Sequence, residues 1–268
     1  MPAAVVAAVA VAQFAPASDR EANLAVMRSL ATTAVERGAT LVLFPEYSSY
    51  FTPEMGPDWI AEAEPLDGAF VHGLAAIAAD LAITVVAGLL ETAGEKAHNT
   101  IVAVAPSGEL LATYRKQHLY DAFGSVESEW IAHGPIGAVE TFAWNGFTVG
   151  MQTCYDIRFP EVSRALVDAG AEILLVPSEW VRGPLKEHHW RTLLTARAIE
   201  NTVYVAAADH TPPIGVGNSM VLDPMGVELV TIGENLDVAV AFPTRDRLVE
   251  VRRINPAVAL RRYRVSAK

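Results

Sequence analysis

The sequence predicts an α/β fold with one mixed β-sheet or two, and three observations lead to this fold class. Short apolar runs alternate with segments of helical spacing over the first 90 residues, which is the pattern of strand–helix–strand units. Two hairpin signals, at residues 106–108 and 145–146, then interrupt the alternation, which afterwards resumes. Hairpins among helical crossovers indicate mixed sheets rather than the purely parallel sheet of a dinucleotide-binding fold.

The first elements are a strand and a helix. Residues 2–12 are apolar but lack a positively charged start, which favours a buried strand over a signal peptide. Ser18 and Glu21 form a Ser-x-x-Glu capping box, which predicts that a helix begins there. Apolar residues recur at helical spacing as Leu24, Met27, Leu30 and Ala34. Gly38 is expected to end this helix.

The remaining elements follow from the same signals. The run Leu41–Phe44 is apolar throughout, which is typical of a strand covered on both faces. Asn145-Gly146 is a tight-turn signal that leads into the next strand. We expect further strands at 83–90, 101–105, 110–114, 147–153, 173–176, 203–207, 219–223 and 227–231. We expect helices at 68–80, 159–169 and 187–200.

Composition excludes several classes of protein. The chain has 268 residues, of which 51% are hydrophobic, and a net charge of −11. Such a chain is globular, and its acidity argues against nucleic-acid binding. No apolar run is long enough for a membrane span, and no linker divides the chain, so we expect one domain over residues 1–268. The basic cluster near the C-terminus predicts a solvated or subunit-bridging face.

Cys154 is the single cysteine of the chain, so it can form neither an intramolecular disulfide nor a multi-cysteine metal site. This usage favours a reducing, cytoplasmic setting. The histidines show no H-x-x-x-H spacing, and Gly215-Val216-Gly217 lacks the dinucleotide-binding pattern. The sequence therefore predicts neither a metal nor a cofactor.

Three polar residues follow apolar strands directly: Glu46, Lys116 and Cys154. Ligands of α/β proteins bind beyond the carboxyl ends of strands, so these three side chains could converge. A carboxylate could accept the thiol proton, and an ammonium group could stabilise the oxyanion formed when the thiolate attacks a carbonyl or nitrile carbon. Each residue alone also fits a simpler interpretation: an inert buried cysteine, a Pro-Glu turn and a solvated strand end.

The flanking residues give the three positions a common pattern. They read Phe44-Pro45-Glu46, then Tyr114-Arg115-Lys116-Gln117-His118-Leu119-Tyr120, then Cys154-Tyr155-Asp156-Ile157-Arg158-Phe159-Pro160-Glu161. Further segments are His189-Trp190, Ala196–Asn201, Tyr204-Val205, Asn218-Ser219 and Asp223–Gly226. In this order they resemble the nitrilase superfamily of carbon–nitrogen hydrolases over almost the whole chain.

The resemblance implies a Glu46–Lys116–Cys154 triad that works through a thioester on the cysteine. Lys116 and the backbone N–H of Tyr155 would hold the oxyanion. A second glutamate near the lysine would be Glu127, with Glu129 as the alternative. The family fold is a four-layer αββα sandwich with two mixed β-sheets. Its members dimerise, so we expect a homodimer, with residues 245–268 as a segment that could cross to the partner subunit.

The residues after the cysteine resemble those of the small Nit-type amidases, which act on ω-amides of 2-oxo acids or on deaminated glutathione. Arg158 would bind a substrate carboxylate, or would instead pair with Glu161 or Asp156 at a helix start. Ser178 and Trp180 are further predicted substrate contacts. Where Nit-type sequences often have a small residue, this chain has Glu179.

The resulting expectation is an amidase that converts a small linear amide to a carboxylate and ammonia. The alternatives are a nitrilase or N-carbamoyl amidohydrolase of the same superfamily, and a catalytically silent binding protein on the same fold. The expected partners are the amide substrate and a second copy of the chain, with no nucleic acid and no membrane.

Overall fold

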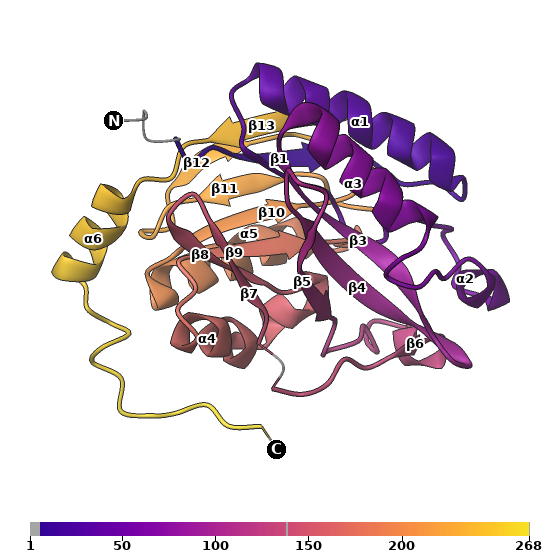
Figure 1. Ribbon diagram of the computed structural model, residues 1–268. Helices are drawn as coiled ribbons and strands as arrows, with labels where there is room; N and C mark the ends of the chain where they lie inside the picture. The colour runs from indigo at the N-terminus through magenta and orange to yellow at the C-terminus, as the bar shows by residue number, and fades with distance from the viewer. Residues whose placement is uncertain (1–5, 138, 268) are drawn as a thin grey trace.

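The structure of the protein, a computed structural model, describes residues 6–137 and 139–267 (Figure 1). Within these residues, one sheet has seven strands in the order β13-β1-β2-β3-β4-β5, with β6 paired to β4. The strands are β1 (Val9–Gln13), β2 (Leu41–Leu43), β3 (Thr84–Ala93), β4 (Lys96–Val104), β5 (Leu110–Arg115), β6 (Ile131–Ala132) and β13 (Asp237–Ala241). Strands β1, β2 and β3 are parallel, whereas β4, β5 and β13 pair with their neighbours in antiparallel fashion.

The second sheet of the described residues has six strands in the order β12-β11-β10-β9-β8-β7. They are β7 (Thr141–Trp144), β8 (Phe147–Met151), β9 (Ile173–Pro177), β10 (Tyr204–Ala208), β11 (Met220–Leu222) and β12 (Glu228–Thr231). Strands β8, β9 and β10 are parallel, and β7 and β11 are antiparallel to their neighbours. Both sheets are therefore mixed, as predicted.

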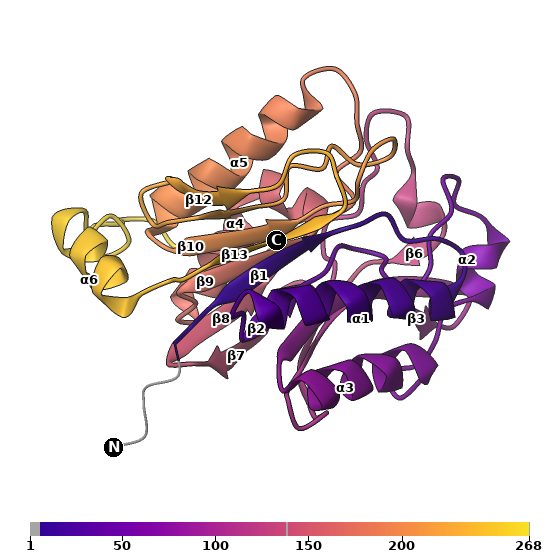
Figure 2. The same cartoon turned by 90° about the horizontal axis from the view of Figure 1, so that it is seen from above.

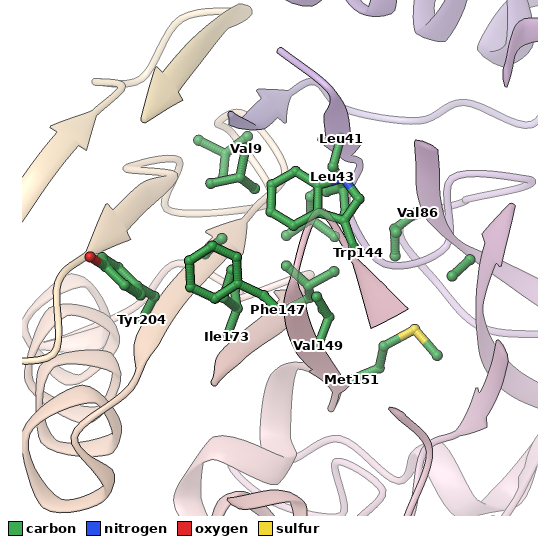
Figure 3. Packing of buried hydrophobic residues seen from close by; sticks show 14 of the residues in the cluster. Val9, Leu41, Leu43, Val86, Trp144, Phe147, Val149, Met151, Ile173 and Tyr204 are labelled. Carbon is green, nitrogen blue, oxygen red and sulfur yellow. The ribbon is translucent and has the colours of Figure 1, made fainter. Parts of the chain in front are cut away.

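Helices cover the outer face of each sheet. Helices α1 (Arg20–Glu36) and α3 (Ala69–Leu81) lie on the first sheet, and α4 (Pro160–Asp168) and α5 (Lys186–Asn201) lie on the second (Figure 2). The inner faces pack against each other through apolar side chains from both sheets (Figure 3). These side chains include Val9, Leu41, Phe147, Val149 and Ile173. The result is the predicted αββα sandwich.

Three short helices and one peripheral helix complete the described part of the chain. Helix α2 (Pro57–Ala61) and the 3-10 helix η1 (Glu127–Glu129) lie in connections of the first sheet, and η2 (Cys154–Arg158) follows β8. Helix α6 (Arg245–Ile254) docks on its own chain, where Arg245 pairs with Glu172 at 2.8 Å. The crossing of residues 245–268 to a partner subunit stays a prediction. No helix among the described residues has the length and apolar character required to cross a bilayer.

Local details differ from the sequence expectation. The predicted cap at Ser18 is wrong by one residue, because the side chain of Asp19 accepts the N–H of Ala22 at 3.0 Å and the helix begins at Arg20. The first strand is Val9–Gln13, later than predicted, and residues 2–5 of that prediction lie outside the described residues. A hairpin that joins β3 and β4 through Gly94 and Glu95 was not predicted.

Candidate active site

A cavity of about 450 Å³ opens beyond the C-terminal ends of β2, β5, β8 and β9. Its described lining includes the loop after β2, Lys116 after β5, the 120–130 segment, Cys154 after β8 and Glu179 after β9. The cavity thus brings together Glu46, Lys116 and Cys154, as the sequence predicts.

Glu46 is held by a close approach between its loop and β3. A Cβ atom on Gly88 would lie 2.8 Å from the Glu46 Cα, so only glycine allows this contact. The carboxylate is almost fully buried and accepts three hydrogen bonds. Oε1 accepts from Lys116 Nζ at 2.8 Å and from Asn99 Nδ2 at 2.6 Å. Oε2 accepts from the backbone N–H of Glu179 at 2.6 Å.

Lys116 is a buried cation between two carboxylates. Its Nζ donates to Glu46 and, at 2.8 Å, to Glu127 Oε2. Burial by itself would lower the pKa of Lys116, but the charges of Glu127 and Glu46 outweigh it and raise that pKa well above its ordinary value. The ammonium group therefore stays charged in the cavity and can stabilise a developing oxyanion.

Glu127, rather than Glu129, is the second carboxylate beside the lysine. Its Oε1 accepts the hydroxyl of Tyr47 at 2.5 Å, and Oε2 accepts the backbone N–H of Tyr120 at 2.5 Å. Burial would raise the pKa of Glu127, but Lys116 and these hydrogen bonds lower it below its usual value. Glu129 is exposed at the cavity rim.

Cys154 sits on a strained turn at the start of η2. Its φ of 40° lies in the left-handed region, which non-glycine residues rarely adopt outside special sites. The thiol donates to the backbone carbonyl of Glu179 at 3.5 Å. Burial, followed by the charge of Glu46, raises the pKa of Cys154 well above its ordinary value. The resting group is therefore a thiol that needs a base, and Glu46 lines the same cavity.

Asp156 ties the cysteine turn to the lysine segment. It is fully buried, and its carboxylate accepts the N–H of Thr153 at 3.0 Å, the hydroxyl of Tyr114 at 2.7 Å and the N–H of His118 at 3.0 Å. Because Tyr114 and His118 flank Lys116, one carboxylate fixes the lysine segment and the cysteine turn relative to each other.

The predicted substrate contacts lie outside the described lining of the cavity. Ser178 is buried, with its N–H bound to the carbonyl of Ala208. Trp180 is buried, and its ring lies 5.5 Å from the ring of Trp190. Its indole N–H donates to the backbone carbonyl of Lys186 at 2.8 Å. Tyr155 packs edge-on against Tyr120, a lining residue.

Arg158 is close to the cavity but has no acidic partner among the described residues. The structure pairs it with neither Glu161 nor Asp156, which removes the alternative of an ion pair at the helix start. Its guanidinium lies 4.9 Å from the centre of the Trp180 ring, and Nη2 lies 3.3 Å from His189 Nδ1. The Nε atom is buried without a hydrogen-bond partner.

Sequence reasoning missed Asn99 and Tyr47, both of which position the carboxylates. Asn99 lies within β4, and its amide bridges Glu46 Oε1 at 2.6 Å and Glu127 Oε1 at 3.0 Å. A polar residue inside an apolar strand costs free energy unless it is paired. The run His98-Asn99-Thr100 within β4 was the signal that could have revealed it.

Asn99→Ala is expected to lower kcat about tenfold while KM changes little, since it removes hydrogen bonds worth about 1 kcal/mol each from the catalytic carboxylates. Steady-state kinetics on any amide that the enzyme hydrolyses would measure this. Asn255→Ala is the matched control, since Asn255 follows the last residue of α6 and lies outside the described lining of the cavity. A kcat equal to that of the wild type would show that the bridge has no catalytic importance.

The family model for carbon–nitrogen hydrolases matches residues 8–253. The chain belongs to the carbon–nitrogen hydrolase family. It is 36% identical over 260 residues to the deaminated glutathione amidase of Escherichia coli O157:H7, covering 95% of this chain and 97% of that protein. It is 32% identical over 274 residues to the human deaminated glutathione amidase, covering 95% of this chain and 82% of that protein.

Solved structures agree with this carbon–nitrogen hydrolase assignment. The NitFhit protein of C. elegans superposes with a TM-score of 0.87 at 29% identity, covering 96% of this chain and 65% of that one. An amidase from Nesterenkonia sp. gives a TM-score of 0.78 at 28% identity, covering 94% and 97%. The protein is therefore an enzyme that hydrolyses carbon–nitrogen bonds.

Proposed function

We propose that this carbon–nitrogen hydrolase is an amidase that converts a small linear amide to a carboxylate and ammonia through a thioester on Cys154. The observation that carries the proposal is the shared cavity. It holds a buried thiol, a carboxylate and a lysine that is already ion-paired. A thiol attack on an amide needs these three functions: nucleophile, base and oxyanion stabiliser.

The first half of the reaction forms the thioester. Glu46 accepts the proton of Cys154 as Sγ bonds to the amide carbon, and the carbonyl electron pair moves onto oxygen. Lys116 and the backbone N–H of Tyr155 stabilise this oxyanion. The electron pair then returns, the C–N bond breaks, and the nitrogen takes the proton from Glu46 and leaves as ammonia.

The second half releases the acid. A water molecule gives a proton to Glu46 as its oxygen attacks the thioester carbon. The C–S bond breaks, and the sulfur recovers the proton from Glu46. Glu127 keeps Lys116 charged and in place throughout, because the ammonium donates to both of its oxygens, at 3.1 and 2.8 Å.

For the substrate we propose an ω-amide of a 2-oxo acid or deaminated glutathione. The names of the relatives support deaminated glutathione, and the charge beside the cavity supports a substrate that carries a carboxylate. Lys186 is buried and donates to the hydroxyl of Tyr120, and its pKa is lowered by burial and by the charge of Arg158. Both cations lie against the rings of Phe123 and Trp180 without an acidic partner among the described residues. A substrate carboxylate would neutralise them.

The alternative within the family remains a nitrilase or N-carbamoyl amidohydrolase. The family match and the intact Glu46, Lys116 and Cys154 set argue against the silent binding protein. We further propose a cytoplasmic homodimer. The single cysteine supports the reducing compartment, and the exposed side chains of Leu260 and Tyr263 after α6 support a contact with a second copy.

Incubation with a panel of short amides, nitriles and N-carbamoyl compounds is expected to release ammonia from the amides fastest, with 2-oxoglutaramate preferred over neutral aliphatic amides.

Arg158→Met is expected to raise KM for 2-oxoglutaramate about tenfold or more, because it removes a charge-assisted contact worth about 1.5–3 kcal/mol. Ammonia release and steady-state kinetics measure both. Neutral amides that react as well as 2-oxoglutaramate would contradict the role of Arg158, and faster release from nitriles would favour the nitrilase alternative.

A further inference from the structure

Glu179 is an acid of the cavity that the proposed mechanism does not use. It lies two residues after the end of β9. Its backbone N–H and its backbone carbonyl each contact a residue of the proposed reaction centre. Its N–H donates to Glu46 Oε2 at 2.6 Å, and its carbonyl accepts the thiol of Cys154 at 3.5 Å. The side chain lines the cavity beside both groups. Glu179 and Cys154 line the same cavity, so a substrate bound at Cys154 lies near Glu179.

The Glu179 carboxyl has no hydrogen-bond or ion-pair partner among the described residues. No described side chain or backbone N–H donates to it, and no described cation pairs with it. The nearby Lys116 ammonium is already bound to Glu46 and Glu127, at 2.8 Å each. The Lys116 ammonium and the carboxylates of Glu46 and Glu127 together carry one negative charge. Ionised Glu179 would add a second negative charge to a cavity with no further cation in its described lining.

A second uncompensated negative charge in a largely buried site is unfavourable, so the group keeps its proton instead. Burial, followed by the charge of Glu46, accordingly raises the pKa of Glu179 well above its ordinary value. A protonated carboxyl has one O–H donor that it can offer to a ligand. Because Glu179 and Cys154 line the same cavity, this donor lies close to the nucleophile.

We propose that Glu179 is a specificity-determining residue that binds the substrate as a neutral acid. Its O–H donates to an acceptor oxygen on the acyl chain of the amide, such as the oxygen of a 2-oxo or 2-hydroxy group. This inference rests on the proposed amidase function and narrows its substrate class to oxygen-bearing acyl chains.

The protonation state can be measured without a substrate. Infrared difference spectra between the wild type and Glu179→Gln at pH 7 are expected to show one protonated-carboxyl band that the variant lacks. Glu36→Gln is the control, because Glu36 is exposed near the end of α1 and its substitution should remove no such band. A carboxylate band in place of the protonated one would overturn the proposal.

The contact with the substrate can be measured with matched amides. 2-Oxoglutaramate and glutaramate differ in the 2-oxo oxygen, and lactamide and propionamide form a shorter pair that differs in one hydroxyl. The wild type is expected to prefer the oxygen-bearing member of a pair in kcat/KM about tenfold, the effect of one buried hydrogen bond. Glu179→Ala is expected to abolish this preference through KM, whereas Glu179→Gln, which keeps a neutral donor, retains most of it.

Three results would contradict the role of Glu179. The wild type could show no preference within either pair, or Glu179→Ala could keep the preference. In the third result the wild type prefers L-glutamine over both 2-oxoglutaramate and glutaramate, and Glu179→Gln loses this preference. That result would show that Glu179 is ionised and binds the ammonium group of the substrate. In each of these three results the wild type still releases ammonia from amides. By contrast, no ammonia from any amide would contradict the proposed function itself, and the infrared band would still report the proton on Glu179.

Discussion

Cys154→Ala is expected to lower kcat by at least about 10⁴-fold, which would bring turnover of every amide close to the background rate. In the proposed mechanism the sulfur forms the thioester, and no other cysteine exists in the chain to replace it. Glu46 and Lys116 remain in the variant, so substrate binding persists. KM is therefore expected to change far less than kcat.

The variant also tests folding separately from chemistry. Cys154 is buried, but alanine removes only one sulfur atom beside a cavity that is already open. The melting temperature is expected to stay within a few degrees of the wild type. Mass spectrometry of enzyme quenched during turnover should show the acyl adduct on Cys154 in the wild type and none in the variant. Undiminished turnover by the variant would refute the thioester mechanism.

Lys116→Met has the second large effect, on both activity and stability. The change leaves the carboxylates of Glu46 and Glu127 buried and joined only through Asn99. Breaking a buried ion pair by removal of one partner typically costs about 3–5 kcal/mol of unfolding free energy. The oxyanion also loses its cation, so kcat is expected to fall about 10³-fold.

The pH dependence of stability is expected to reverse in this variant. In the wild type the pKa of Glu127 is lowered, so its contribution to stability is present above the unfolded pKa of about 4.3 and is lost as the pH falls through the folded value. Without Lys116 the pKa of Glu127 rises above the unfolded value. The folded variant then binds the extra proton, so its stability falls as the pH rises from 5 to 8.

Urea unfolding at pH 5 and pH 7.5 measures this reversal. The unfolding free energy of Lys116→Met is expected to be closer to that of the wild type at the lower pH. The double variant Lys116→Met with Glu127→Gln is expected to recover part of the lost unfolding free energy at pH 7.5. Lys96→Met is the control, because Lys96 donates to the Ser128 carbonyl outside the ion-paired cluster. A loss in Lys116→Met that is the same at both pH values would show that the buried charges do not control stability.

The elements of the fold were largely readable because each has a local cause. The apolar run Leu41–Phe44 and the turn Asn145-Gly146 determine a strand and a hairpin through nearest neighbours alone, and both are found. The cap at Asp19 was missed because adjacent Ser18 is an equally good cap in sequence. The geometry of the N–H of Ala22 selects between them.

The site was predictable only in part, for a related reason. Glu46 and Lys116 follow β2 and β5 of the first sheet, and Cys154 follows β8 of the second. The local pattern predicts that each lies beyond a strand end, where ligands of α/β proteins bind. Only the packing of the two sheets brings the three together. Asn99 and Asp156 act through partners distant in sequence, and no local pattern signals such contacts. The predicted contact Trp180 turns inward because its indole N–H binds the Lys186 carbonyl, a bond that depends on the path of the following loop.

The sequence by itself determined the alternation of strands and helices and the order of the three reactive groups, since periodicity and turn chemistry act over a few residues. Only the tertiary structure decided how these groups are charged. Lys116 is shared by two carboxylates, the thiol rests protonated, and no described cation forms an ion pair with Glu179. Charge states depend on burial and on neighbours from other strands, which exist only once the two sheets have packed together.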